Sequence, residues 1–140
     1  MKLGYDDHVE AFRAEFTTWL AQHAPSQDEM AADPPHSSAH RPDWAKAWAR
    51  RMFDDGWLVP GWEPDRGGRD AGPIETLVYL EELAKAGVPR TTNPQGLGIV
   101  VPSLYDYGTD AQIGEYFRVF VAYAVISVAL VLHAWRKPKR

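Results

Sequence analysis

The stretch from Gly56 to Gly87, GWLVPGWEPDRGGRDAGPIETLVYLEELAKAG, constrains the fold of this chain more than any other part. Its first half is rich in glycine and proline, which the interior of a helix does not tolerate. Its second half has a proline suited to a first helical turn, apolar residues at helical spacing and a closing glycine. The pattern predicts a helix that ends at Gly56, an irregular loop to Gly72, and a helix from Pro73 that ends at Gly87.

Apolar spacing elsewhere predicts further helices and no strand. Asp7, followed by Glu10, fits the start of a first helix as a capping-box variant. Asp43 fits the cap of a second helix. The predicted apolar face of the first helix consists of Val9, Phe12, Phe16, Trp19 and Leu20, and that of the second of Trp44, Ala47, Trp48 and Met52. The helix after Pro73 has a predicted apolar face of Ile74, Leu77, Val78 and Leu83.

Two segments depart from regular helix. Residues 24–42 combine Pro, Ser, Ala and Asp without a periodic apolar face, and they predict a long, mobile connection. Residues 96–106 predict a short, broken helix, because Pro102 lacks a backbone donor. Thr109 with Gln112 is a capping-box pattern for a last helix. The expected fold class is all-α, an irregular bundle of about five helices.

Composition narrows the classes of function. The 140 residues contain no cysteine, which excludes a disulfide framework, a thiolate nucleophile and a cysteine-ligated metal site. Residues 1–135 hold 11 basic and 19 acidic residues, a net charge of −8, so we expect no nucleic-acid partner. The first residues have no apolar run and are acidic by residue 6, which is unlike a secretory signal. The expected location is cytoplasmic.

Two blocks of the sequence resemble the N-terminal helical domain of the flavin-dependent acyl-CoA dehydrogenases. The first block holds Gly56-Trp57, Pro60, Asp65, Gly67-Gly68 and Glu81-Glu82-Leu83-Ala84. The second, GIVVPSLYDYGTDAQIGEYF from Gly98 to Phe117, has a proline followed by a Tyr-Gly-Thr helix start. Order and spacing match the family over residues 5–117. The resemblance implies an all-α family domain over residues 1–117 and a non-family segment over residues 118–140.

The resemblance also implies a reaction. In the family, a glutamate removes the α-proton of an acyl-CoA thioester, FAD takes the β-hydride, and electrons pass to a flavoprotein acceptor. The base lies in a C-terminal helical domain, and the flavin contacts lie in a β-domain around Glu-Pro and Gly-Ser-Asp motifs. No such pair of motifs follows Phe117. We therefore expect no catalytic residue here, FAD as a cofactor only by family resemblance, and no activity of the chain alone.

By the same resemblance, residues 93–102 (NPQGLGIVVP) help to line the acyl-chain pocket. The predicted substrate-binding residues are Leu97, Val100 and Val101, which supply apolar wall, while two glycines allow close approach of a chain. Ordinary packing of a short helix explains the same residues equally well.

A glutamate pair could suggest an acid/base site and a glycine-rich loop could suggest a phosphate site, but ordinary structural roles explain both better. Glu81 and Glu82 point about 100° apart on a helix, so they do not converge on one substrate atom. The glycines of residues 66–72, flanked by Arg66 and Arg69, have neither a G-x-G-x-x-G nor a GxxxxGK[ST] spacing. A tight turn accounts for them better than a phosphate cradle does.

One histidine pair and one tryptophan pair have helical spacing that could suggest a metal or stacking site. His36 and His40 have a spacing that could ligate zinc on a helix, but they lie in a Pro/Ser-rich stretch, so no metal site is expected. Trp44 and Trp48 are expected in a core or an interface rather than stacked on a base or flavin.

The C-terminal segment admits three interpretations. Residues 119–135 are almost entirely apolar and are followed by four basic residues among the last five. They can be a short membrane anchor, a helix that packs on the domain or a partner, or the product of a reading frame lost near residue 117.

Two classes of function follow. The first is an inactive part of an acyl-CoA dehydrogenase, whose acyl-CoA substrate belongs to the full-length family. The second is a non-catalytic module in a homo- or hetero-oligomer with a flavin-bearing chain, or membrane-associated through residues 119–135.

Overall fold

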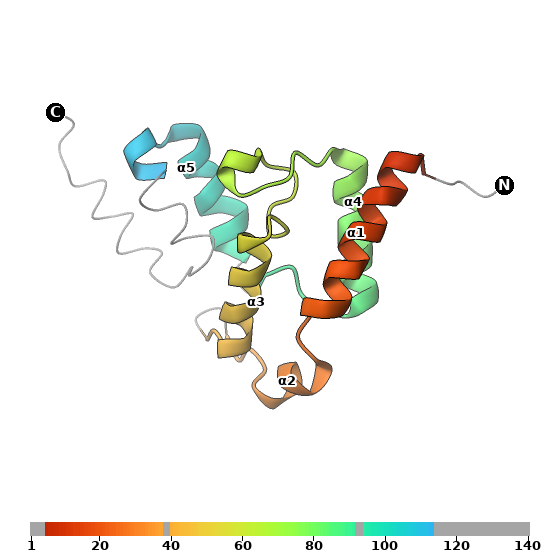
Figure 1. Cartoon of the computed structure of the whole chain (residues 1–140). Helices are drawn as coiled ribbons and strands as arrows, with labels where there is room; N and C mark the ends of the chain where they lie inside the picture. The colour runs from red at the N-terminus through yellow and green to blue at the C-terminus, as the bar shows by residue number, and fades with distance from the viewer. Residues whose placement is uncertain (1–4, 38–39, 92–93, 114–140) are drawn as a thin grey trace. The chain divides into compact units, whose positions relative to one another are not determined.

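The computed structural model describes residues 5–37, 40–91 and 94–113 (Figure 1). These residues form helices, turns and loops, and no strand occurs among them, which confirms the predicted all-α class. The elements are α1 (Asp7–His23), α2 (Gln27–Ala32), α3 (Asp43–Asp54), η1 (Pro64–Arg66), α4 (Pro73–Ala86), η2 (Gly96–Val100) and α5 (Val101–Tyr107). None of the described helices is long and apolar enough to cross a bilayer.

The chain divides into two compact units. Unit 1 is Met1–Pro34 with Arg51–Arg90, and unit 2 is Pro35–Arg50 with Thr91–Arg140, so the division falls inside α3. The predicted C-terminal hydrophobic helix over residues 118–140, with its candidate membrane segment 119–135, lies outside the described residues.

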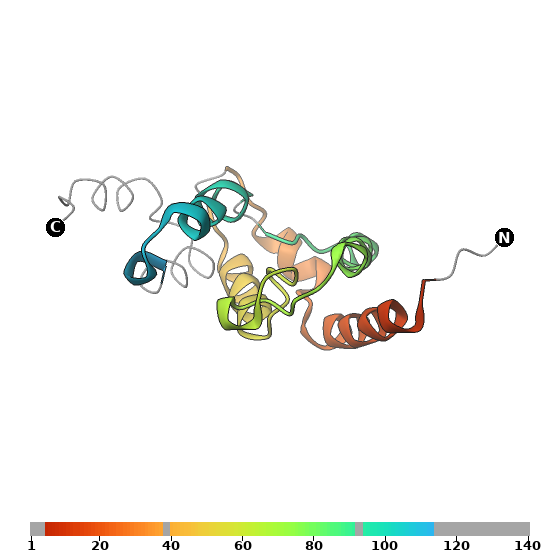
Figure 2. The ribbon, with the colours of Figure 1, turned by 90° about the horizontal axis from the view of Figure 1, so that it is seen from above.

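In unit 1, α1 and α4 lie side by side (Figures 1 and 2). Val9, Phe16 and Leu20 of α1 are buried, as their spacing predicts. Phe12 and Trp19, at the edges of the same stripe, are half-buried.

Phe16 is the centre of an aromatic cluster in this unit. Its ring centroid lies 4.6 Å from that of Trp57 and 4.8 Å from that of Tyr79. Trp57 follows the end of α3, and Tyr79 lies on α4. The three rings therefore join helix, loop and helix in one core.

The prediction for the apolar side of α4 was wrong for two of its four residues. Val78 and Leu83 are buried, but the exposed fractions of Ile74 and Leu77 are 47% and 48%. The buried side carries Tyr79 and Glu82 instead. Because α4 has apolar residues around most of its circumference, spacing alone did not identify the side that faces α1.

The buried side of α3 also differs from the prediction at one position. Trp44, Trp48 and Met52 are buried as predicted. Ala47 is exposed, and the small residues Ala45 and Ala49 are buried in its place.

Helix starts and loops required three corrections. Asp6, not Asp7, caps α1, because its side chain accepts the N–H of Val9 at 3.0 Å. Adjacent aspartates offer the same capping chemistry, and the backbone conformation selects one of them.

Asp43 is the first residue of α3, and its carboxylate accepts a hydrogen bond from Lys46 at 2.8 Å. The predicted connection over residues 24–42 contains α2, which Ser26 caps.

The predicted helix ends are confirmed. Gly56 and Gly87 adopt left-handed conformations, with φ of 77° and 66°, after α3 and α4. Pro73 occupies the first turn of α4. The Thr109–Gln112 capping box forms, since Gln112 N–H donates to the Thr109 hydroxyl and Thr109 N–H donates to the Gln112 side chain.

The segment around Pro102 is a broken helix, as predicted. η2 is a single π-helical turn in which the N–H of Val101 donates to the carbonyl of Gly96, five residues back. Pro102 then lies in the first turn of α5, where its missing donor costs little.

Candidate functional site

The three predicted substrate-binding residues lie together at the junction of η2 and α5 in unit 2. Leu97 and Val101 are buried, and Val100 is half-buried. Ile99, which the sequence analysis passed over, is the most exposed apolar residue of this turn, at 64%. Ile99 and Val100 are therefore the apolar side chains of this turn that can be reached from outside.

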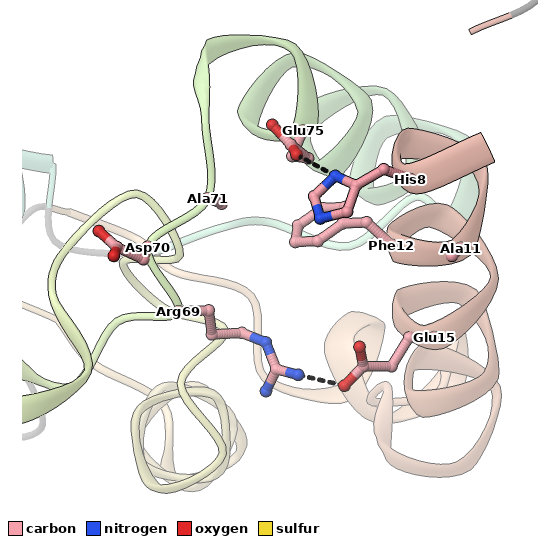
Figure 3. A pocket seen from close by; sticks show the side chains of 8 residues that line it. All are labelled: His8, Ala11, Phe12, Glu15, Arg69, Asp70, Ala71 and Glu75. Atoms are coloured by element: carbon pink, nitrogen blue, oxygen red, sulfur yellow. Dashed lines mark hydrogen bonds and ion pairs between the residues drawn. The ribbon is translucent and has the colours of Figure 1, made fainter. Parts of the chain in front are cut away.

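A separate hollow opens in unit 1, among α1, the loop after η1 and the start of α4 (Figure 3). Its cavity volume is about 310 Å³. Phe12, Ala11 and Ala71 give it apolar lining, and the remaining lining residues are charged or titratable: His8, Glu15, Arg69, Asp70 and Glu75.

Most charges in this hollow are paired with one another. His8 Nδ1 lies 2.8 Å from Glu75 Oε1, which ties α1 to the first turn of α4. Arg69 pairs with Glu15 of α1. Figure 3 shows both pairs on the rim and the Asp70 side chain directed away from the hollow. The two pairs join α1 to the start of α4 and to the loop after η1.

Arg69 is the main anchor of the glycine-rich loop. Its guanidinium lies 4.0 Å from the ring centroid of Trp57, and Nη1 donates to the Asp55 carbonyl at 3.0 Å. Together with the Glu15 pair, these contacts use both the charge and the flat face of the guanidinium.

The glycine pair before Arg69 is a turn, as predicted. Gly67 has φ of 82°, and its N–H donates to the Pro64 carbonyl. Arg66 pairs with Glu63 at 3.4 Å. Both arginines beside the glycines are thus engaged with acidic or aromatic partners and do not form a phosphate cradle.

Glu81 and Glu82 have different environments, as predicted for adjacent helix residues. Glu82 is buried and accepts hydrogen bonds from Arg13 of α1 and from Lys85. Glu81 is partly exposed, and its nearest cation is Arg13 at 3.8 Å. Burial by itself would raise the pKa of Glu82, but the hydrogen bonds and charges of Lys85 and Arg13 outweigh it and lower the pKa.

This shift predicts an acid-sensitive contribution of Glu82 to stability. A lowered folded-state pKa stabilises the fold above the unfolded pKa of about 4.3, and the contribution disappears as pH falls through the folded value. We expect Glu82→Gln to lower the free energy of unfolding by about 1–2 kcal/mol at pH 7. Urea titrations from pH 7 to pH 3 measure this effect. The difference in the free energy of unfolding between Glu82→Gln and the unmodified chain should shrink as the pH falls.

Glu81→Gln is the matched control for this prediction, because it removes the neighbouring and more exposed carboxylate. We expect a change within about 0.5 kcal/mol at every pH. If the loss of unfolding free energy in Glu82→Gln stayed the same down to pH 3, that result would contradict a stabilising ion pair.

The histidine pair of unit 2 does not lie in a helix. The rings of His36 and His40 stack with centroids 4.7 Å apart, and the backbone N–H of His36 lies 3.3 Å from Nδ1 of His40. That contact makes this nitrogen an acceptor from the backbone.

Sequence reasoning missed the pairs that hold unit 1 together. Arg13 and Glu82 are 69 residues apart, and Arg69 and Glu15 are 54 apart. Only Glu82 gave a hint, since a carboxylate on the buried side of a helix needs a partner. Nothing in the sequence pattern indicated the Arg69–Glu15 pair.

The sequence is similar to those of acyl-CoA dehydrogenases. Residues 6–123 match the family described as "Acyl-CoA dehydrogenase, N-terminal domain". The chain is 31% identical over 108 residues to acyl-CoA dehydrogenase IpdE1 of Mycobacterium tuberculosis (strain ATCC 25618 / H37Rv), covering 74% of this chain and 28% of that protein. It is 27% identical over 115 residues to acyl-CoA dehydrogenase FadE26 of the same strain, covering 80% and 28%. The chain thus spans 28% of the length of these curated relatives.

Solved structures share the fold. The ChsE4–ChsE5 complex from Mycobacterium tuberculosis superposes with a TM-score of 0.64 at 24% identity, covering 87% of this chain and 30% of that chain. The Tcur3481–Tcur3483 steroid ACAD gives 0.61 at 23% identity, with the same two coverages of 87% and 30%.

Proposed function

Because this chain belongs to the acyl-CoA dehydrogenase family through its N-terminal domain, we propose that it contributes the helical domain to the FAD-dependent dehydrogenation of acyl-CoA thioesters without catalysing the reaction alone. The observation that carries the proposal is the family match over residues 6–123, combined with a span of only 28% of the relatives' length.

The described residues support the absence of turnover by the chain alone. Dehydrogenation needs a base near the α-carbon, a flavin near the β-carbon, and hydrogen bonds to the thioester oxygen. Glu82 is a poor base, because hydrogen bonds from Arg13 and Lys85 lower the pKa of its carboxylate and so weaken its affinity for a proton. Glu81 is the next residue on the same helix, and its carboxylate lies 3.8 Å from Nη1 of Arg13.

The glycine-rich loop of residues 66–72 does not supply a pyrophosphate site by itself. A pyrophosphate needs converging donors such as free arginines or helix N-termini. Arg66 and Arg69 are both engaged in ion pairs. We therefore assign FAD, when the reaction occurs, to a flavin-bearing chain that works together with this domain.

The contribution of this chain to such an assembly is apolar surface. Ile99 and Val100 at the turn of η2 would help to line the acyl chain, with Leu97 and Val101 holding the turn from the buried side. The description of one solved relative as a complex of two chains supports a heteromeric arrangement.

The test is a turnover assay on the purified full chain. With FAD, an artificial electron acceptor, and either a straight-chain or a steroid-type acyl-CoA thioester, we expect no acceptor reduction and no stoichiometric flavin in the protein. Measurable turnover, or a tightly bound yellow flavin at one per chain, would overturn the proposal.

Fractionation of the source cells separates the remaining possibilities. Co-purification with a flavoprotein supports the subunit role. Recovery in the membrane fraction, abolished by removing residues 119–135, would support the alternative of a membrane-associated module.

A further inference from the structure

His36 and His40 form a close pair in the loop of unit 2 that precedes α3. Their spacing of four residues is that of a zinc-binding helix, but neither residue lies in a helix. Hydrogen bonds to Ser37 turn the chain instead, because the N–H of His40 lies 3.1 Å from both the carbonyl oxygen and the hydroxyl of Ser37. The two imidazole rings stack with centroids 4.7 Å apart and planes 9° apart. The loop thus brings together two side chains that a helix would otherwise have to align.

The distance between the two rings is one that a single metal ion can span after a small movement. A ligand nitrogen of His36 lies within 4.8 Å of a ligand nitrogen of His40. Two nitrogens bound to one tetrahedral zinc, at about 2.0–2.1 Å each, are about 3.4 Å apart. Rotation of the side chains covers the difference, since His36 is exposed and His40 is half-buried.

The backbone contact between the two residues is compatible with metal binding. The N–H of His36 lies 3.3 Å from Nδ1 of His40, which is longer than the usual hydrogen bond from a backbone N–H. A metal ion at this nitrogen would therefore replace a weak partner. The N–H of His36 would then donate to water, because this residue is exposed.

We propose that His36 and His40 together bind one divalent ion of the Zn²⁺, Ni²⁺ or Cu²⁺ type, with water completing the coordination. Imidazole nitrogen suits these ions, whereas Mg²⁺ and Ca²⁺ prefer oxygen ligands. The chain has no cysteine that would compete for them. Structural zinc sites have four protein ligands and catalytic sites three, so two histidines hold the ion reversibly. The proposal is independent of the proposed function.

Calorimetric titration of the purified full chain with Zn²⁺ at pH 7 tests the site. We expect saturable binding of one Zn²⁺ per chain and none of Mg²⁺. His36→Gln and His40→Gln should each weaken Zn²⁺ binding by about tenfold or more, because each removes one of the two protein ligands. His8→Gln is the matched control, since it removes an exposed histidine of unit 1 that lies 2.8 Å from Glu75, and it should bind Zn²⁺ normally.

Nuclear magnetic resonance of the unmodified chain locates the ion without any substitution. Paramagnetic Ni²⁺, added below one equivalent, should broaden the ring resonances of His36 and His40. The ring resonances of His8 and His23 should stay sharp, because His8 pairs with Glu75 and Nδ1 of His23 lies 2.8 Å from the carbonyl of Trp19.

Each outcome decides the proposal. Loss of Zn²⁺ binding in both variants, with normal binding by His8→Gln, supports the two-histidine site. Unchanged binding by either variant would overturn it, as would the absence of saturable Zn²⁺ binding to the unmodified chain. Broadening confined to other histidines would place the ion elsewhere and overturn it as well. Thermal unfolding without metal confirms that the variants fold, and if one of them does not, the resonance experiment alone decides.

Discussion

Phe16→Ala is expected to lower the free energy of unfolding by about 3–5 kcal/mol, the range for deleting a fully buried phenylalanine ring. Phe16 has no exposed surface, and its ring touches those of Trp57 and Tyr79. Its removal leaves a cavity at the point where α1, α4 and the loop after α3 meet. Since small domains have only about 5–15 kcal/mol of stability, much of the population should unfold near physiological temperature.

Urea unfolding followed by tryptophan fluorescence measures this loss, because Trp57 lies beside the deleted ring. Tyr107→Ala is the matched control, since it removes an aromatic ring that is 87% exposed. We expect it to change stability by less than about 0.5 kcal/mol. Equal effects of the two substitutions would show that the aromatic cluster does not hold unit 1 together.

Gly68→Ala is the second change with a large expected effect. A methyl group at Gly68 would lie 2.0 Å from the carbonyl oxygen of Trp62, a backbone atom that cannot rotate away. The loop must therefore shift, and with it Arg69, which anchors the loop to Glu15 and Trp57. We expect a loss of about 3 kcal/mol, the upper end of the cost of overpacking.

Gly98→Ala is the control for the same chemical change. Apart from its chain neighbours and the backbone of its own helix, no heavy atom lies within 4 Å of the position that a methyl group would take at Gly98, and its backbone is helical. Replacing glycine by alanine at such a site stabilises by about 0.4–1 kcal/mol. Thermal unfolding of both variants measures the contrast, and a Gly68→Ala chain as stable as Gly98→Ala would contradict the close approach at Trp62.

The candidate site was only partly accessible to sequence reasoning. The pattern of residues 93–102 placed Leu97, Val100 and Val101 on one short turn, and the structure places them there. Which side chains of this turn remain reachable from outside was decided by tertiary packing, which leaves Ile99 exposed and buries Leu97 and Val101. Their role toward an acyl chain stays a prediction.

The sequence by itself determined that the fold is all-α and where α1, α3 and α4 lie, but it did not reveal α2. Proline at the first turn of α4, left-handed glycines at its end and at the end of α3, and the Thr109–Gln112 capping box act within a few residues, so a linear pattern contains them. Only the tertiary structure decided which side of α4 faces α1, and which acid pairs with Arg13 and Arg69. Periodicity reports that an apolar stripe exists, but the element that covers it is set by contacts between residues far apart in the chain.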